Sequence, residues 1–396
     1  MKTADSYAFG GKRALVRVDF NVPLNSAFEI TDDSRMTAVL PTISKILADG
    51  GSVVLMSHLG RPKGGPEEKY SLRHLVPHLE KLTGVPVVFS DDCISEKATD
   101  TSKNLPAGSI HLLENLRFYT EETAGDAAFA ASLAKHGNIY VNDAFGTAHR
   151  AHASTAIVAQ YFDDKCFGFL MAKEVANAKK LMSNPERPFT SIVGGAKVSD
   201  KILIIENLLN IADHIIIGGG MAYTFSVAQG GTIGNSLFEA DRVEKCAEIL
   251  EKAAAKGVQI HLPADNVCAD AFSNDANQQL CASGEIPDGW MGLDIGEKAI
   301  AAFTDVLLES KTILWNGPMG VFEMTSYEKG TKAVAQAVAD ATKAGAFSLI
   351  GGGDSSAAVK KFGFTDDVSY VSTGGGALLE FFEGKELPGI VAVENE

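Results

Sequence analysis

Short apolar runs alternate with longer amphipathic stretches along the whole chain. Each run is rich in Val, Ile and Leu, and a glycine or polar turn separates it from the helical pattern that follows. This alternation is typical of parallel sheets whose strands are buried between helices. The predicted strands of the first half are Ala14–Val18, Val53–Met56, Val85–Phe89, Ile110–Leu113 and Ile139–Val141. Those of the second half are Ser191–Val193, His214–Ile217, Thr312–Trp315, Phe347–Ile350 and Tyr370–Val371.

Each half therefore supports a sheet of its own, and a chain of 396 residues is long enough for two domains. We expect an α/β protein with two doubly wound, Rossmann-like domains and parallel sheets, joined by a linker helix. Apolar residues on one face from Leu170 to Met182, followed by Pro185, predict that helix. The expected ranges are 1–169 for the first domain, 170–186 for the interdomain helix, 187–373 for the second domain and 374–396 for a final segment. A further helical pattern from Met36 to Leu47 contains Pro41, which must kink the helix or lie in an early turn.

Charge and cysteine content limit the partners of the protein. The chain has 35 Lys plus Arg against 50 Asp plus Glu, a net charge of −15, which argues against nucleic acid or an anionic membrane as a main partner. Five cysteines without a C-x-x-C pair indicate neither a disulfide framework nor a zinc knuckle. The N-terminus has no apolar signal region, and the uncharged stretch from Ile215 to Phe238 is rich in glycine. We therefore expect a cytoplasmic protein in which that stretch is a strand, a glycine turn and a helix.

Arginine and glycine are distributed unequally between the two halves. Seven of the nine arginines lie in the first 150 residues, whereas the second half has triple-glycine turns that begin at Gly218, Gly351 and Gly374. The guanidinium fork matches carboxylate and phosphate groups, and glycine lets backbone N–H groups approach a phosphate at the start of a helix. This distribution predicts a small-anion site in the first half and a nucleotide site in the second.

Three of the arginines follow predicted strands at the place where doubly wound sheets bind ligands. Arg61, Arg117 and Arg150 could converge on one crevice, or each could pair with a local carboxylate such as Glu114 or Asp143. Two histidines in the same region, His149 and His152, are three residues apart. They are metal ligands or, because no third ligand is evident, part of a basic pocket or of the packing.

In the second half, a glycine pair follows the strand that ends at Val193. Lys197 and Lys201 come after it, four residues apart, which places both ammonium groups on one face of the expected helix. They bind a phosphate there or belong to a solvated helix face. Asp354, at the next expected helix start, is an N-cap or a ligand for Mg²⁺.

Several familiar motifs are absent from the chain. There is no G-x-G-x-x-G, no G-x-x-x-x-G-K-[ST], no H-R-D or D-F-G and no G-x-S-x-G. These absences weaken the dehydrogenase, Walker-type nucleotidase, protein kinase and serine hydrolase interpretations.

Eight longer stretches of the sequence stand out: Val16–Pro23, Ser57–Pro62, Glu114–Phe118, Asn142–Arg150, Gly194–Lys201, Trp315–Glu323, Gly351–Ser355 and Ser372–Gly376. In this order, and over essentially the whole chain, they resemble the motifs of the phosphoglycerate kinase family. The resemblance implies that the first domain binds 3-phosphoglycerate or 1,3-bisphosphoglycerate and that the second binds ADP or ATP with Mg²⁺. It also implies that the segment 374–396 contains a hinge and that Glu386–Glu396 returns to the first domain.

Residue by residue, the resemblance assigns ligands in both domains. Those expected for the acid substrate are Asp19, Asn21, Arg35, His58, Gly60, Arg61, Arg117 and Arg150. Those expected for the nucleotide are Gly195, Lys197, Lys201, Gly219, Gly292, Asn316, Glu323, Gly351, Gly352, Gly353, Asp354 and Ser355. Among them, the resemblance makes Asp354 the metal ligand and puts Asn316 and Glu323 beside the nucleoside.

The implied reaction is a direct in-line phosphoryl transfer between an acyl phosphate and ADP. Such a transfer needs no side-chain nucleophile and no general base, so catalysis depends on positioning and charge neutralisation. We expect Arg35, Lys197 and the N–H groups of Gly353 and Gly374 to act on the moving phosphoryl group, in a monomer that closes its two domains. A non-catalytic nucleotide sensor and a Rossmann oxidoreductase are the alternative functions.

Overall fold

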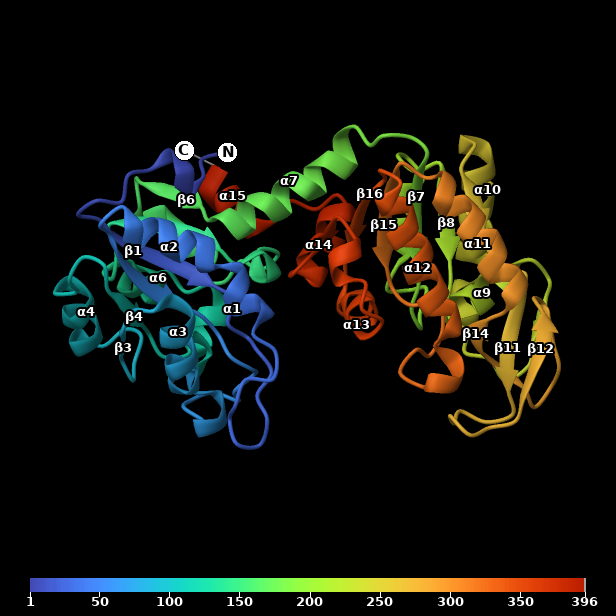
Figure 1. Cartoon of the computed structure of the whole chain (residues 1–396), viewed down its shortest axis with the longest axis horizontal. Helices are drawn as coiled ribbons and strands as arrows, with labels where there is room; N and C mark the ends of the chain where they lie inside the picture. The colour runs from blue at the N-terminus through green and yellow to red at the C-terminus, as the bar shows by residue number, and fades with distance from the viewer. Residues whose placement is uncertain (395–396) are drawn as a thin grey trace. The chain divides into compact units, whose positions relative to one another are not determined.

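The computed structural model describes residues 1–394 and divides into two compact units, shown in Figure 1. The first contains Met1–Ala176 and the segment that starts at Glu386; the second contains Asn177–Lys385. The division falls within helix α7 (Phe169–Ser183), where the linker helix is expected. The expected final segment is divided as well, because residues 374–385 belong to the second unit. Asn395 and Glu396, part of the segment expected to return to the first domain, lie outside the described residues.

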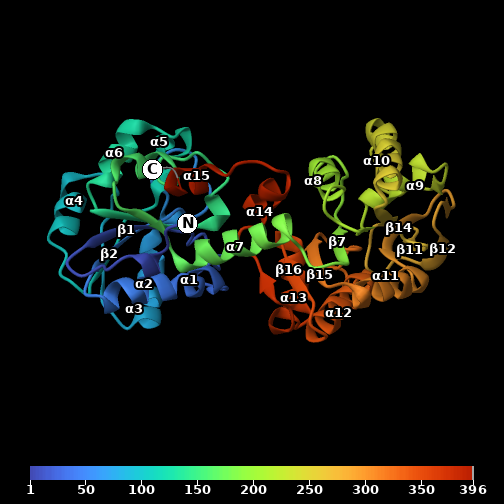
Figure 2. The ribbon, with the colours of Figure 1, turned by 90° about the horizontal axis from the view of Figure 1, so that it is seen from above.

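The first unit is a six-stranded parallel sheet in the order β3-β4-β2-β1-β5-β6. Helices α1–α3 lie on one side of it and α5 and α6 on the other, as Figure 2 shows. The strands are β1 Arg13–Val18, β2 Ser52–Met56, β3 Val87–Phe89, β4 Ile110–Leu112, β5 Ile139–Asp143 and β6 Lys165–Phe167. The helices are α1 Ser34–Ala38, α2 Leu40–Ala48, α3 Val76–Thr83, α4 Glu96–Lys103, α5 Thr120–Ala124, α6 Ala127–Ala134 and α15 Pro388–Glu394. Short 3-10 helices are η1 Ala4–Ser6, η2 Glu68–Tyr70, η3 Leu72–Leu75, η4 Leu116–Phe118, η5 Phe145–Thr147 and η6 Ile157–Tyr161.

The second unit has its own six-stranded parallel sheet, in the order β10-β8-β7-β15-β16-β17. Helices α8–α10 and α11–α13 cover its two sides (Figure 2). Its strands are β7 Phe189–Val193, β8 His214–Ile217, β10 Gln259–His261, β15 Thr312–Asn316, β16 Phe347–Ile350 and β17 Tyr370–Val371. Two small sheets are added by β11 Asp265–Ala269, β12 Gln278–Ala282 and β14 Met291–Ile295, and by β9 Thr232–Ile233 and β13 Glu285–Ile286. The helices are α8 Ile202–Leu208, α9 Met221–Ala228, α10 Val243–Lys256, α11 Glu297–Glu309, α12 Lys329–Lys343, α13 Gly353–Lys361 and α14 Gly375–Phe382, with η7 Ala240–Arg242, η8 Thr325–Tyr327 and η9 Thr365–Asp367.

Both main sheets reverse their strand order at a central strand. In the first unit the chain leaves β1 toward β2 and later returns to β5 on the other side of β1. In the second unit it leaves β7 toward β8 and returns to β15 on the other side of β7. Loops diverge at such a switch point and leave a crevice outside the carboxyl ends of the strands. Each unit therefore has one place where its topology favours a ligand.

The predicted fold class is confirmed, and every strand predicted from an apolar run is present. The predictions missed the edge strands β6 and β10, because each has only three residues, too few for its apolar side chains to form a recognisable run. They also missed the small antiparallel sheet, whose strands mix polar and apolar residues. Pro41 lies in the first turn of α2, and Val39 separates α2 from α1, so the helical pattern from Met36 to Leu47 is two helices.

The start of helix α7 is fixed by a carboxylate from the sheet. Asp143, the last residue of β5, accepts a hydrogen bond from the backbone N–H of Met171 at 2.9 Å. A side chain on Gly168 would collide with this carboxyl group, since a Cβ there would lie 2.2 Å from Asp143 Cγ. Burial raises the pKa of Asp143 to about 7. The sheet of the first unit thus holds the first turn of the helix that leads out of it.

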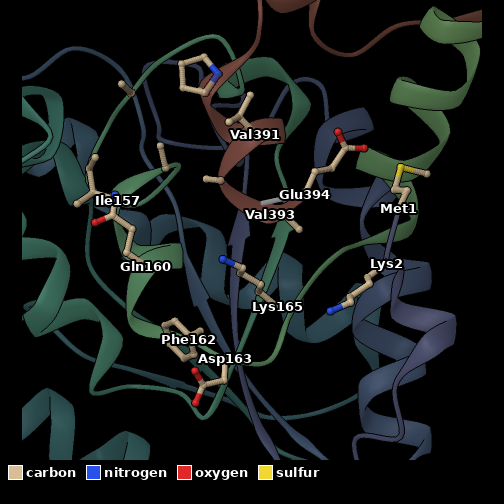
Figure 3. Close-up of a pocket in the computed structure, with 14 residues that line it drawn as sticks. Met1, Lys2, Ile157, Gln160, Phe162, Asp163, Lys165, Val391, Val393 and Glu394 are labelled. Atoms are coloured by element: carbon tan, nitrogen blue, oxygen red, sulfur yellow. The ribbon is translucent and has the colours of Figure 1, made fainter. Parts of the chain in front are cut away.

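Helix α15 completes the first unit. It borders a cavity of about 1110 Å³ that Met1, Lys2 and Lys165 also line, as Figure 3 shows. Asn142 Nδ2 donates to the carbonyl of Gly389 at 3.1 Å, which ties this helix to β5. Within residues 1–394, no helix is long and apolar enough to cross a membrane. All five cysteines are free and buried.

Two fully buried histidines share one hydroxyl group in the first unit. Ser102 Oγ lies 2.9 Å from His111 Nδ1 and 2.6 Å from His136 Nδ1. His111 Nε2 contacts Ser90 Oγ at 2.8 Å, and His136 Nε2 contacts the carbonyl of Cys93 at 3.0 Å. Burial lowers the pKa of each histidine to about 4. The network therefore joins α4, β4 and two loops through neutral imidazoles.

We predict that acid weakens the first unit through this network. A histidine whose folded-state pKa is lowered contributes stability that is present above its unfolded value of about 6.5 and is lost as the pH falls toward 4. Urea unfolding followed at pH 7, 5.5 and 4.5 should show that loss. In NMR spectra, the ring protons of His111 and His136 should not titrate between pH 8 and 5. Titration of the two buried rings near pH 6.5 would contradict the prediction.

Candidate functional site

The first half of the site lies at the carboxyl ends of four adjacent strands, β4, β2, β1 and β5. Asp19 follows β1, His58 follows β2, and Arg117 follows β4 in η4. Because these strands are parallel, their following loops meet at one edge of the sheet. The topology thus brings together residues that are up to 131 positions apart in the sequence, from Asp19 to Arg150.

Asp19 and Arg35 form an ion pair at this edge. Arg35 Nη1 donates to Asp19 Oδ2 at 3.1 Å and to the carbonyl of Asn21 at 3.2 Å. About a third of the Arg35 side chain, 36%, stays exposed. Asp19 therefore orients Arg35 while part of its guanidinium group can still meet a ligand.

Gly60 links Asn21 to Arg117. The Gly60 N–H donates to Asn21 Oδ1 at 2.8 Å, and Arg117 Nη1 donates to the Gly60 carbonyl at 2.9 Å. A side chain at Gly60 would collide with Tyr70, at 2.2 Å from its ring. The Nε of Arg117 is buried without a protein partner among residues 1–394. Such a donor is available to an anion.

Arg17 is a part of the site that the motif assignments missed. It is 1% exposed, and it donates from Nε to Ser154 Oγ at 2.9 Å and from Nη2 to His58 Nδ1 at 3.2 Å. A third bond goes to the carbonyl of Val18. Since arginine can only donate, Nδ1 of His58 must accept, and the proton of a neutral His58 sits on Nε2. The apolar run of β1 could have flagged Arg17, because it is a charged residue between apolar residues of a buried strand.

The electrostatics leave Asp19 charged and His58 neutral. Burial alone would raise the pKa of Asp19, but its basic neighbours His58, Arg35 and Arg17 together hold that pKa below its usual value. Burial, together with Arg17, Arg117 and Arg35, lowers the pKa of His58 to about 3 despite Asp19. A neutral imidazole adds no charge to the cluster, so it can donate a hydrogen bond without increasing the repulsion among the arginines.

The remaining predicted arginines join this basic cluster. Arg61 and Arg150 are exposed; the charge of Arg61 acts on Arg117 and that of Arg150 on His152. Burial, followed by the charges of Arg117, Arg17 and Arg150, lowers the pKa of His152 to about 4. Glu114 accepts from Ser71 Oγ and from the N–H of Leu72, so it is not an arginine partner. The arrangement favours a shared anion site over local pairing.

The second half of the site lies at the switch point between β7 and β15. There the N–H of Gly194 donates to the carbonyl of Asn316 at 2.8 Å. Lys201 Nζ donates to Asn316 Oδ1 at 2.5 Å, and Asn316 Nδ2 donates to the carbonyl of Gly351 at 2.8 Å. The buried Asn316 therefore connects the loops after β7, β15 and β16.

The prediction that Lys197 and Lys201 share a helical face is wrong. Helix α8 begins at Ile202, so Lys197 lies in an exposed loop and Lys201 in the cap position. Glu239 accepts hydrogen bonds from the backbone N–H and the hydroxyl of Ser199, at 2.9 and 2.6 Å. These bonds hold the segment between the two lysines out of the helix. Burial lowers the pKa of Lys201, while Asp200 and Asp354 oppose that effect.

Two helix N-termini lie close together beside Lys201 and Asn316. A Cβ on Gly375, the first residue of α14, would lie 2.6 Å from the Cα of Gly352, the cap of α13. Ser355 is buried and accepts from the N–H of Gly317 at 2.6 Å. Gly353 is exposed, whereas the N–H of Gly374 donates to Ser372 Oγ at 3.2 Å. The N–H of Gly374 is therefore bonded within the protein, whereas Gly353 lies at the surface.

A cavity of about 430 Å³ adjoins these helix starts. It is lined by Gly195, Ala196, Gly219, Gly220, Tyr223, Asn235, Leu237, Phe272, Met291, Gly292, Leu293, Pro318, Met319, Gly320, Val321, Glu323 and Asp354. The wall is mostly apolar, with Glu323 and Asp354 as its acidic groups, which suits a flat base with a polar sugar and phosphates. Asn316 does not line this cavity, and it lies with Lys201 instead. Sequence reasoning missed Tyr223, Leu237 and Phe272, because single apolar residues in loops and helices give no signal.

Asp354 fits a role as ligand for Mg²⁺. Asp354 is exposed in the first turn of α13, and the cap position of that helix is Gly352 instead. Magnesium is commonly held by one or two carboxylates together with substrate phosphates, so a single protein ligand is enough. Among the described residues, no group of three or more His, Cys, Asp or Glu could hold a metal ion by itself. His149 and His152 therefore belong to no such group.

We predict that Gly352 and Gly353 respond differently to a methyl group. Gly352 has φ +95°, and its Cβ would lie 2.7 Å from Asn316 Nδ2, whereas nothing lies within 4 Å of a Cβ on Gly353. Gly352→Ala should cost about 1–3 kcal/mol of unfolding free energy, measured in urea, through backbone strain and the collision. Gly353→Ala, the matched control, should stay within about 0.5 kcal/mol. Equal losses in both variants would contradict the role of this close contact.

Comparison with known proteins gives one consistent result. The phosphoglycerate kinase family model matches residues 4–385. Phosphoglycerate kinase of Porphyromonas gingivalis is 54% identical over 99% of this chain and 100% of its own length. Cytosolic phosphoglycerate kinase 3 of Arabidopsis thaliana is 52% identical over 97% of this chain and 96% of its own length.

The solved structures agree with the sequence relatives. Phosphoglycerate kinase from Coxiella burnetii superposes with a TM-score of 0.89 at 41% identity, covering 99% of this chain and 98% of that one. The resemblance of the sequence motifs, the two switch-point sites and these matches lead to the same conclusion: the chain belongs to the phosphoglycerate kinase family.

Proposed function

We propose that the two switch-point sites are the substrate sites of a magnesium-dependent phosphoglycerate kinase. The enzyme transfers a phosphoryl group reversibly between 1,3-bisphosphoglycerate and ADP, giving 3-phosphoglycerate and ATP. The observation that carries the proposal is that the motifs of both half-sites are complete and that each half-site is assembled within its own unit. We further propose a cytoplasmic monomer that acts on small molecules, a compartment shared with the cytosolic phosphoglycerate kinases among the relatives.

In the first unit, the basic cluster of Arg35, Arg61, Arg117 and Arg150 binds the phosphate and carboxylate of the acid. Asp19 and Asn21 orient Arg35, and the neutral His58 offers its Nε2–H to the ligand. Because Arg17 donates a hydrogen bond to His58 Nδ1, that nitrogen stays unprotonated and the ring proton stays on Nε2. When this acid binds, its phosphate and its carboxylate thus take the place of water around the four guanidinium groups.

In the second unit, the apolar cavity holds the nucleoside, with Gly219 and Gly292 in its wall and Glu323 at the sugar. Lys197, Lys201 and Gly353 face the phosphates, together with the backbone at Gly195, Gly351 and Gly352. Asn316 positions Lys201 rather than contacting the base. Bound at Asp354, Mg²⁺ would neutralise charge on the phosphate oxygens.

The chemistry requires no proton transfer from the protein. A carboxylate attacks the phosphoryl group in line and the nucleotide leaves as its own anion, so the side chains act by orientation and by compensating charge. Arg35 and Lys197 are suited to this, because both retain solvent-exposed cationic groups. The N–H of Gly353, at the start of α13, is a further donor.

A direct assay tests the proposal. Purified protein should form ATP from 1,3-bisphosphoglycerate only when ADP and Mg²⁺ are both present. A protein that binds ADP without turnover would be the nucleotide sensor, and binding of NAD with hydride transfer would indicate the oxidoreductase.

We predict that Arg35→Ala loses kcat by a factor on the order of 10³ to 10⁵, as when an arginine that stabilises a phosphoryl transition state is removed. The affinity for ADP should change little, because Arg35 lies in the first unit. Arg73→Ala is the matched control: it removes an arginine of the same unit whose guanidinium lies over Phe89. A loss of less than about tenfold in Arg35→Ala, about 1.4 kcal/mol, would contradict its role.

We also predict that both ligands together drive closure of the two units. Each unit carries one substrate site, and in-line transfer needs reacting atoms about 3 to 3.5 Å apart in a site shielded from water. Each ligand alone should favour closure weakly and both should favour it strongly. Small-angle scattering should give the smallest radius of gyration with 3-phosphoglycerate and a non-hydrolysable Mg-ATP analogue together. The four samples are the free protein, the protein with either ligand alone and the protein with both. An identical radius of gyration in all four would rule out closure while leaving the chemistry intact.

A further inference from the structure

Two histidines meet at the edge of the second sheet, on strands that carry none of the proposed substrate ligands. His214 begins β8, and His261 ends β10, the edge strand beside it. His214 Nδ1 lies 3.1 Å from His261 Nε2, and the two rings have their centroids 5.2 Å apart. Both side chains are half-buried, so solvent reaches them.

The sheet itself holds the two rings together. The parallel register pairs Gln259 with His214 and places His261 two residues further along β10. Side chains two residues apart on a strand point to the same face, so His214 and His261 are diagonal neighbours on one face. The backbone N–H of Gln259 donates to the carbonyl of Asp213 at 2.9 Å, which fixes the register next to the pair.

The separation of the two nitrogens suits a shared metal ion. Two nitrogens each about 2.0–2.1 Å from a zinc-like ion lie about 3.3 Å apart at the tetrahedral angle and about 2.9 Å apart at a right angle. The observed 3.1 Å lies between these values. Imidazole nitrogen is a good ligand for Zn²⁺, Cu²⁺ and Ni²⁺ and a poor one for Mg²⁺.

We infer that His214 and His261 form a two-imidazole site for a divalent transition-metal ion, with water completing the coordination. The ion takes the place of the hydrogen that the two nitrogens now share. The imidazole that donates this hydrogen stays neutral, because its proton moves to the other ring nitrogen. Burial and His214 lower the pKa of His261, which favours the neutral form that a metal ion requires.

Binding at this pair would fasten the edge of the sheet. Among the strands of residues 1–394, β10 pairs only with β8, and a metal ion bound by both strands adds a second link between them. The site is separate from the proposed magnesium site at Asp354, because the ligand types differ. A test of metal binding by His214 and His261 is therefore independent of the proposed reaction.

Metal titration of the full-length chain, free of any affinity tag and stripped with a chelator, tests the inference. Calorimetry with Zn²⁺ and Ni²⁺ should give one tight site, which His214→Gln and His261→Gln each weaken at least tenfold, since a chelate needs both rings. His74→Gln, which removes a half-buried histidine of the first unit, is the matched control and should leave the affinity unchanged. Mg²⁺ should not compete.

A spectroscopic measurement on the unaltered protein makes the test independent of how the variants fold. One equivalent of Cu²⁺ should give an electron paramagnetic resonance signal with two equatorial imidazole nitrogens, and should raise the melting temperature of the wild type but not of either variant. A single coordinated nitrogen would overturn the inference, as would wild-type affinity in both variants.

Discussion

The reversal of strand order at the centre of each sheet is the constraint on which both half-sites depend. At β1 and β5, and again at β7 and β15, adjacent strands send their following loops in opposite directions. A crevice then opens where backbone groups would otherwise pack against one another. In the first unit charged side chains reach this crevice, and in the second, glycines let the backbone approach it closely. The same reversal of strand order thus suits a small polyanion in the first unit and a nucleotide in the second, because the residues that follow the strands differ between the two units.

Side chains at the two crevices are held by different physical means. In the first unit a chain of contacts runs from Arg35 through Asp19 and Asn21 to Gly60 and Arg117, so that each charge orients its neighbour. In the second unit the buried Asn316 ties Lys201 to the carbonyl of Gly351. An amide serves there because it accepts from the lysine and donates to the carbonyl at once. In both cases the geometry is preorganised by hydrogen bonds to the proposed ligand-binding groups themselves, such as those of Arg35 and Lys201.

Much of the fold could be predicted from the sequence, since parallel strands buried on both faces form continuous apolar runs such as Val53–Met56. Short edge strands such as Gln259–His261 carry too few apolar residues to be recognised. The motifs located the site residues, but their local conformation depended on distant partners. Spacing placed Lys197 and Lys201 on a helix, and the bonds between Ser199 and Glu239, 40 residues away, prevent it. Arg17 and the pairing of His214 with His261 likewise follow from tertiary contacts that periodicity does not encode.

The basic cluster of the first unit is costly to assemble, and its composition limits that cost. Arg17 is buried with a serine hydroxyl, an imidazole and a carbonyl as hydrogen-bond partners, and Arg117 has a buried nitrogen without one. Two histidines in the cluster, His58 and His152, have lowered pKa values and stay neutral near pH 7, so they add no positive charge. Asp19 neutralises part of the positive charge of the arginines, but the cluster keeps an excess of cations. A bound polyanion supplies the missing negative charge. Repulsion among these cations lowers the stability of the free protein. Binding of the acid substrate relieves that repulsion, and the relief contributes to the free energy of binding.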